Sequence, residues 1–283
     1  IMNFEKECLL TNNERRLNKL KQIFMKRIRG PFERGEYIKW VIEKPYGYAG
    51  DFKYLEDLYE NNPITVGFDR LFDNYTMMSA IAIAVRNRKN DFKRFIVEYV
   101  SLRQNQPIRI MNLGSGPCRE IYEMLMENGS LFENVVFDCY DNDISSIQFA
   151  QGRLSKYKKI HFFKENATRI AFRKDVNTLI SKKYDIIYST GLFDYFEEKI
   201  ASPLIKNLRK ILTSEGMLLI SDVRDRYSNP SLFFMEWVGE WELVYRNDDE
   251  FRGLFTDAGF NARDITPDYE QQGILQYIRA KLE

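Results

Sequence analysis

The chain has 283 residues, of which 44% are hydrophobic and 29% charged, so it can bury a core as one large domain or as one domain with a cap. A formal net charge of +1 provides no long-range attraction, so neither nucleic acid nor an anionic membrane is expected as a partner. No apolar run approaches the roughly 20 residues of a membrane-spanning helix, and no membrane span is expected.

Cysteine usage and the start of the chain bear on the compartment. Cys8, Cys118 and Cys139 lie far apart and have no C-x-x-C spacing. The sequence therefore favours neither a disulfide framework nor a zinc site, no metal is expected, and the cytoplasm is the expected location. No signal-peptide pattern opens the chain. Because the first residue is Ile1, the sequence leaves open whether an upstream segment has been removed.

The first 105 residues show helical periodicity and no strand signal. The pattern predicts one helix over 5–29, ended by Gly30-Pro31, and a short helix over 34–42. Asp51 closes a loop rich in tyrosine and glycine and is placed to cap the next helix. From 68 to 104 the pattern is helical again, as one helix or two. We expect residues 1–105 to form a helical cap or substrate region.

After Pro107 strand and helix patterns alternate, which is typical of a parallel sheet with right-handed crossovers. Five strands are predicted in this part, over 108–113, 135–140, 160–163, 184–188 and 217–220. Later elements are helices over 198–212 and 248–258 and two strands over 262–265 and 274–280. The predicted fold class is therefore α/β over residues 106–283.

A glycine turn joins the first predicted strand to its helix. Gly114 and Gly116 allow a sharp turn and close approach to a ligand, and Pro117 suits the first helical position. The helix start favours a carboxylate or phosphate. A dinucleotide fingerprint would need glycine where Arg119 stands, and a P-loop would need Gly-Lys-Ser/Thr, which is absent. A strand–helix turn that binds no ligand remains an open alternative.

Polar residues follow the predicted strands where a ligand of an open α/β sheet binds. Asp141 could accept both hydroxyls of a ribose, or it could cap the next helix; we assign the cap to Asp143 and the ribose to Asp141. Asn166 could pair with an adenine edge or could be a turn residue. The segment 189–194 is expected to line the reacting centre.

These segments resemble, in order and spacing, the class I S-adenosylmethionine (SAM) methyltransferases over residues 107–283. Four segments are similar to a bacterial subfamily labelled 3-hydroxypalmitic acid methyl ester biosynthesis proteins, namely 44–51, 84–88, 112–120 and 191–195. The resemblance implies a Rossmann-like, mostly parallel sheet whose last strand is antiparallel. Two positions depart from the pattern: Asn112 stands where most of the superfamily has Asp or Glu, and Cys118 replaces the third glycine.

The resemblance implies SAM as the cofactor. The residues it assigns to SAM are Asn112, Gly114, Ser115, Gly116, Asp141, Asn142, Asn166, Ala167, Ser189 and Thr190. Tyr46, Arg86 and Tyr195 are the residues assigned to the acceptor and to catalysis, with Arg88 as an alternative to Arg86 for orienting an anionic acceptor. A carboxylate acceptor is ionised at neutral pH and needs no general base.

The sequence therefore predicts a SAM-dependent methyltransferase that acts on a small molecule, with a carboxylate such as a hydroxy fatty acid as a candidate acceptor. Two alternatives stay open: a non-catalytic module that binds SAM or a partner, and, less favoured, a nicotinamide oxidoreductase. The identity of the acceptor and the oligomeric state cannot be read from the sequence.

Overall fold

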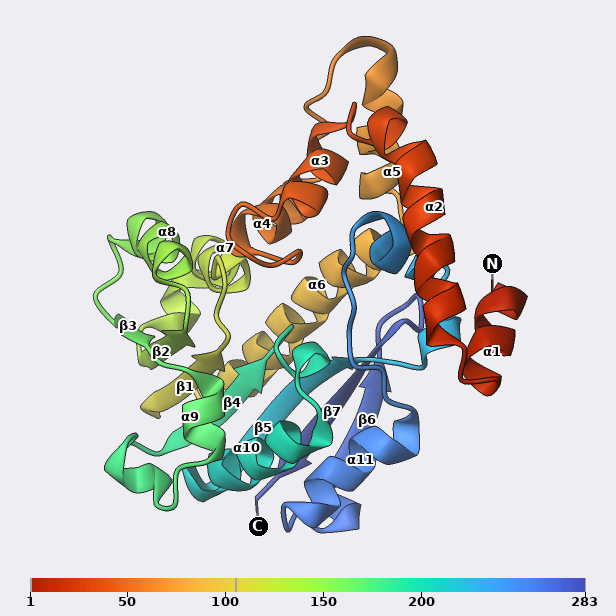
Figure 1. Ribbon diagram of the computed structural model, residues 1–283. Coiled ribbons are helices and arrows are strands. Elements are labelled where there is room, and N and C mark those ends of the chain that lie inside the picture. Colours follow the sequence, from red (N-terminus) through yellow and green to blue (C-terminus); the bar gives the residue numbers. More distant parts are fainter. Residues whose placement is uncertain (1, 105, 283) are drawn as a thin grey trace. The chain divides into compact units, whose positions relative to one another are not determined.

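The computed structural model describes residues 2–104 and 106–282 (Figure 1). It divides into two compact units, which are described separately: unit 1 comprises Ile1–Ile83 and Asn229–Glu242, and unit 2 comprises Ala84–Ser228 and Leu243–Glu283. These limits differ from the sequence-based ones because the chain joins the sheet-containing unit already at Ala84, and because residues 229–242 group with the N-terminal helices. The role of residues 1–105 as a substrate cap stays a prediction.

Unit 1 is built from helices. They are α1 (Met2–Leu10), α2 (Glu14–Phe32), α3 (Glu36–Glu43), α4 (Phe52–Glu60), α5 (Arg70–Met77) and the start of α6 (Ala80–Ser101). A small core of Cys8, Leu17 and Trp237 joins α1 and α2 to the segment 229–242. Within the part of the chain that the structure describes, no helix is both long and apolar enough to cross a membrane.

Local side-chain chemistry sets the helix ends in unit 1. The single helix predicted over 5–29 is wrong, because Asn12 adopts a left-handed φ of 51° and the Asn13 side chain caps α2. Gly30-Pro31 does not end α2 either, since a proline so near the helix end removes only one hydrogen bond. The Asp51 cap is confirmed: its carboxylate accepts a hydrogen bond from the Tyr54 N–H at 2.8 Å.

Unit 2 contains a seven-stranded sheet with the order β3-β2-β1-β4-β5-β7-β6. The strands are β1 (Ile108–Leu113), β2 (Val135–Asp141), β3 (Ile160–Lys164), β4 (Tyr184–Ser189), β5 (Leu212–Val223), β6 (Ile265–Tyr269) and β7 (Leu275–Lys281). Strands β1 to β5 run parallel, and β7 is antiparallel to both neighbours. The predicted fold class is confirmed; the strand predicted over 262–265 is wrong, because a 3₁₀ turn precedes β6 there.

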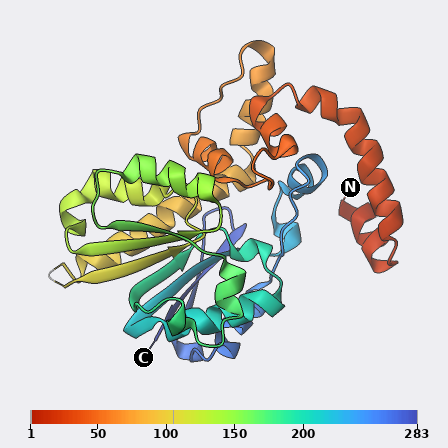
Figure 2. The ribbon, with the colours of Figure 1, turned by 60° about the vertical axis from the view of Figure 1, so that its left-hand side comes forward.

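Helices cover both faces of the sheet (Figure 2). Helices α9 (Ala167–Ala171), α10 (Glu198–Lys210) and α11 (Asp248–Asp257) share one apolar core with alternate residues of β1, β4, β5 and β7. The other face carries α7 (Arg119–Asn128), α8 (Ile144–Leu154) and the part of α6 that belongs to unit 2. There Phe92 packs against Tyr188 and Tyr277, with ring centroids 6.2 and 5.3 Å apart. The carboxyl ends of β1, β2 and β4 therefore meet at one edge between two packed layers.

A buried polar cluster fastens β1 to the first turn of α7. Glu120, only 6% exposed, accepts hydrogen bonds from Asn112 Nδ2 at 2.9 Å and from the Tyr188 hydroxyl at 2.8 Å, both on the same carboxylate oxygen. Burial raises the pKa of Glu120. An acid at Asn112 would place a second carboxylate beside this one, so the amide found here suits the buried Glu120.

A second cluster joins α6 to α7. Glu123 receives hydrogen bonds from Lys89 at 2.5 Å, from Lys93 at 2.8 Å and from Arg119 at 2.8 Å. Burial alone would raise the pKa of Glu123, but the hydrogen bonds from these three cations outweigh it and lower the pKa to about 2. One carboxylate thus holds three cations from two helices.

We expect Asn112→Asp to destabilise the fold at pH 7.5 by about 2–4 kcal/mol, because two buried carboxylates then face each other. The folded pair binds a proton more tightly than the unfolded chain, so the loss should shrink as the pH falls to 5.5. Urea unfolding at both pH values measures it. The double variant Asn112→Asp/Glu120→Gln restores one carboxylate and one amide and should regain most of the lost free energy. Equal stability of Asn112→Asp and wild type at pH 7.5 would contradict this account.

Glu123→Gln should lower the free energy of unfolding at pH 7 by about 2–3 kcal/mol, because three cations lose the Glu123 carboxylate, although Lys93 keeps its ion pair with Glu127. The folded pKa of about 2 lies below the unfolded value of roughly 4.3, so this stabilisation is complete above the unfolded pKa and is lost as the pH falls towards 2. The difference between variant and wild type in urea unfolding should therefore narrow in acid. As a matched control, Glu127→Gln removes a 55% exposed carboxylate that pairs with Lys93, and it should cost less than about 1 kcal/mol.

Candidate functional site

The turn after β1 has the left-handed backbone conformation that its two glycines predict. Gly114 and Gly116 adopt φ angles of 67° and 53°, in the left-handed region. The N–H groups of Gly114 and Ser115 donate to the Tyr140 carbonyl at 2.8 and 3.1 Å, which ties the turn to the end of β2. A Cβ on Gly114 would lie 3.1 Å from Leu192 Cβ, whereas no described atom lies within 4 Å of a Cβ on Gly116. Gly114 therefore serves packing, and the backbone at Gly116 stays open.

The position of the third glycine keeps a glycine-like backbone although it holds a cysteine. Cys118 has a φ of 49°, and α7 begins only at Arg119. The prediction that Pro117 takes the first helical position is wrong, because the left-handed Cys118 stands between the proline and the helix. A non-glycine residue costs on the order of 1 kcal/mol in this conformation. The Cys118 thiol is fully buried, and the neighbouring Cys139 thiol together with burial raises its pKa well above the usual value.

Asp141 links the end of β2 to the glycine turn. Its Oδ2 accepts the Gly116 N–H at 2.8 Å and its Oδ1 accepts the Asp143 N–H at 2.9 Å. Asp143 caps α8 through the Ser145 N–H at 2.8 Å, so the assignment of the cap to Asp143 is confirmed. Burial raises the pKa of Asp141. A carboxylate offers about four acceptor positions, and the backbone N–H groups of Gly116, Asp143 and Asn142 use three of them, which leaves a position for a hydroxyl donor.

The residues after β3 present a helix cap. Asn166 is exposed, and its Oδ1 accepts the Thr168 N–H at 2.8 Å as the N-cap of α9. The turn role left open for Asn166 is thus present, and its contact with adenine stays a prediction. Ala167 is buried as the first residue of α9, and Asn142 is exposed between β2 and α8.

Ser189 ends β4 with its side chain turned to the backbone. The Ser189 hydroxyl is buried and donates to the Leu113 carbonyl at 2.8 Å, which joins the ends of β4 and β1. Thr190, the next residue, is half-buried. Ser115 is 5% exposed, and its hydroxyl has no hydrogen-bond partner among residues 2–104 and 106–282. A buried hydroxyl without a partner beside an open glycine turn is what a ligand-binding turn would present.

The three residues assigned to the acceptor are distributed over both units. Tyr46 belongs to unit 1, where its ring packs against Phe52 and Trp40 with centroids 4.7 and 6.2 Å apart. Arg86 and Tyr195 belong to unit 2; Arg86 is half-buried and burial lowers its pKa, while Tyr195 is 38% exposed in a 3₁₀ turn after β4. The roles of all three stay predictions.

The sequence pattern misses a buried cluster of two arginines and two aspartates near the end of β5. Arg246 Nη1 lies 2.7 Å from Asp222 Oδ2, and Arg88 Nη1 lies 3.5 Å from Asp194 Oδ2. All four side chains are at most 7% exposed. Burial, followed by the neighbouring Asp194, raises the pKa of Asp222 well above its usual value. No periodicity in the sequence brings these four positions together, because they come from α6, β5 and two loops.

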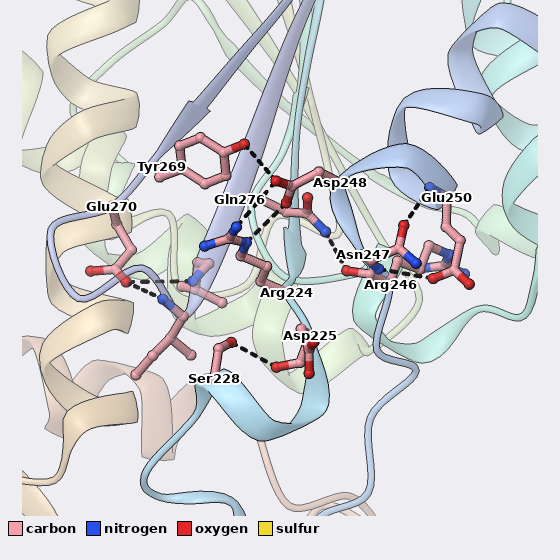
Figure 3. A network of polar contacts seen from close by, with 12 residues as sticks. Arg224, Asp225, Ser228, Arg246, Asn247, Asp248, Glu250, Tyr269, Glu270 and Gln276 are labelled. Carbon is pink, nitrogen blue, oxygen red and sulfur yellow. Dashed lines mark hydrogen bonds and ion pairs between the residues drawn. The ribbon is translucent and has the colours of Figure 1, made fainter.

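A polar network supports this end of the sheet (Figure 3). Arg224 holds both carboxylate oxygens of Asp248 at 2.9 and 3.1 Å, and the Tyr269 hydroxyl donates to the same carboxylate at 3.0 Å. Gln276 Nε2 donates to the Arg246 carbonyl at 2.7 Å. The segment after β5 is thereby fixed to α11, β6 and β7. No group of three or more potential metal-ligating side chains occurs among the residues described.

Neither a family model nor a curated protein matches this sequence. Several solved structures are similar to it. One, a possible exported protein from Bordetella parapertussis, has a TM-score of 0.64 and 16% identity, over 82% of this chain and 79% of that chain. Magnesium protoporphyrin IX methyltransferase from Synechocystis PCC 6803 with bound S-adenosylhomocysteine (SAH) has a TM-score of 0.56 and 13% identity, over 82% of this chain and 94% of that chain.

A third similar structure is an O-methyltransferase family protein from Burkholderia thailandensis, with a TM-score of 0.52 and 16% identity over 90% of this chain and 72% of that chain. At identities of 13–16%, these structures show that the backbone folds are similar, but they assign no role to individual side chains. The strand order and the antiparallel β7 agree with it. The chain therefore has the Rossmann-like fold of the class I SAM-dependent methyltransferases.

Proposed function

We propose that this protein is a SAM-dependent methyltransferase of a small-molecule acceptor. The observation that carries the proposal is the bond between the Asp141 carboxylate and the Gly116 N–H, which sets an acid beside an open glycine turn at the carboxyl edge of the sheet. An open α/β sheet binds its ligand at this edge, beside its first strand. Methyltransferases with bound SAM or SAH among the similar structures support the same reading.

The residues at this edge fit the group. Asp141 has an acceptor position left for a ribose hydroxyl, and the Ser115 hydroxyl lacks a partner within the described chain. Gly116 has no Cβ to block the approach. SAM would supply a methyl group on a positively charged sulfur. The protein's own residues would hold and orient the two reactants and exclude water. Proximity and preorganised electrostatic interactions would then favour the transfer.

The acceptor we propose is a carboxylate, with a hydroxy fatty acid as the candidate that the resemblance to the bacterial subfamily supports. A carboxylate is ionised at neutral pH, so no general base is required of this site. Tyr46, Tyr195 and either Arg86 or its alternative Arg88 are proposed as acceptor-side residues on the same resemblance. We also propose a cytoplasmic location, which the spacing of the cysteines supports, and a bacterial origin, which the resemblance to the bacterial subfamily supports.

Isothermal titration with S-adenosylhomocysteine tests the proposal. Wild type should bind it with micromolar affinity, and Asp141→Asn should bind at least tenfold more weakly, because the amide nitrogen cannot accept a ribose hydroxyl. Asp143→Asn is the matched control: asparagine keeps the α8 cap, so its affinity should stay within twofold of wild type. Absence of heat with wild type, or binding of NAD(P) in its place, would overturn the proposal.

A further inference from the structure

Arg88 on α6 is a buried cation whose donors are incompletely used. It is 4% exposed, and its one ion pair within the described chain joins Nη1 to Asp194 Oδ2 at 3.5 Å. Its Nε has no hydrogen-bond partner among the described residues. A guanidinium carries five N–H donors and stays charged, and buried donors are normally satisfied. Arg88 is therefore missing an acceptor.

The backbone places this guanidinium next to the cofactor edge. A Cβ on Gly191 would lie 3.0 Å from Arg88 Nη2, so the glycine allows the guanidinium to lie against the segment after β4. The next residue, Leu192, packs on Gly114 of the glycine turn. Ser189, two residues earlier, bonds to the Leu113 carbonyl. The chain after β4 thus connects Arg88 directly to the turn assigned to SAM.

The neighbouring carboxylates satisfy the donors of Arg88 only in part. Asp194 is shared, because its Oδ1 accepts the Val223 N–H at 2.8 Å while only Oδ2 faces Arg88. Asp222 is engaged by Arg246 at 2.7 Å. Arg88 therefore depends on one carboxylate that it shares with the backbone of β5, and its Nε has no acceptor within the described chain. A buried guanidinium in this position is stabilised by a further acceptor.

We infer that Arg88, lying against Gly191, is the residue that binds a carboxylate of the methyl acceptor. This inference rests on the proposed function and assigns the acceptor contact to Arg88, not to Arg86. The planar guanidinium can offer two parallel N–H donors to a carboxylate. The same chemistry could come from the amino-acid part of the methyl donor, so the experiment separates the two sources.

Calorimetry measures how tightly carboxylate probes bind to the complex of the protein with S-adenosylhomocysteine. The probes are decanoate, 3-hydroxydecanoate and benzoate, each compared with its carboxamide. At least one carboxylate should bind wild type tenfold more tightly than its carboxamide does. Arg88→Gln should bind that carboxylate at least tenfold more weakly than wild type. Arg88→Lys keeps the positive charge but lacks the paired N–H donors of the guanidinium, so its affinity should lie between those of wild type and Arg88→Gln. Gly191→Ala should also weaken it, because the new Cβ displaces the guanidinium.

Arg94→Gln is the matched control, since Arg94 lies on the same helix with a side chain 65% exposed, and it should bind each probe as wild type does. Unchanged binding of S-adenosylhomocysteine by Arg88→Gln shows that the variant is folded. The inference is overturned if no carboxylate binds wild type, or if Arg88→Gln binds them equally well. It is also overturned if Arg88→Gln weakens S-adenosylhomocysteine tenfold but leaves 5′-methylthioadenosine, which lacks the amino-acid part, unchanged. Failure of wild type to bind S-adenosylhomocysteine would instead reject the proposed function.

Discussion

The hydrogen bond from the Gly116 N–H to the Asp141 carboxylate is the constraint on which the candidate site depends. It holds the turn after β1 against the end of β2, and the second carboxylate oxygen fixes the start of α8 through Asp143. The bond requires a left-handed Gly116 and a carboxylate at the tip of the neighbouring strand. Turn, strand end and helix start are therefore positioned together by hydrogen bonds within the chain itself.

Most of the sheet could be predicted from the sequence, because buried parallel strands are short apolar runs between turn residues. The predicted ends of the strand Ile108–Leu113 match the observed ones, and the predictions for β2, β3 and β4 each end one residue too early. The start of β5 was missed, since Thr213, Ser214 and Glu215 interrupt its apolar pattern. The helix predicted at the N-terminus is too long, because an asparagine cap inside a helical pattern carries no periodic signal.

The site could be predicted only in part, for a different reason. Glycines and acids at strand ends are local features, so the turn and the cap at Asp143 follow from neighbouring residues. The contact of Arg88 with Asp194 spans 106 positions in the sequence, and nothing local marks it. The same holds for Asn112: its departure from the superfamily pattern is visible in the sequence, but its physical reason, the buried Glu120, appears only when β1 and α7 pack.

The thiol of Cys118 gives the turn a built-in reporter. Cys118 is fully buried and lies between the glycine turn and the start of α7. A thiol-specific reagent can therefore reach it only during transient opening, and its labelling rate measures how often that happens. Any molecule that binds to the closed turn should lower the labelling rate of Cys118, whatever its chemistry. Mass spectrometry of the peptide that contains Cys118 would thus detect ligands that bind at this edge, without a turnover assay.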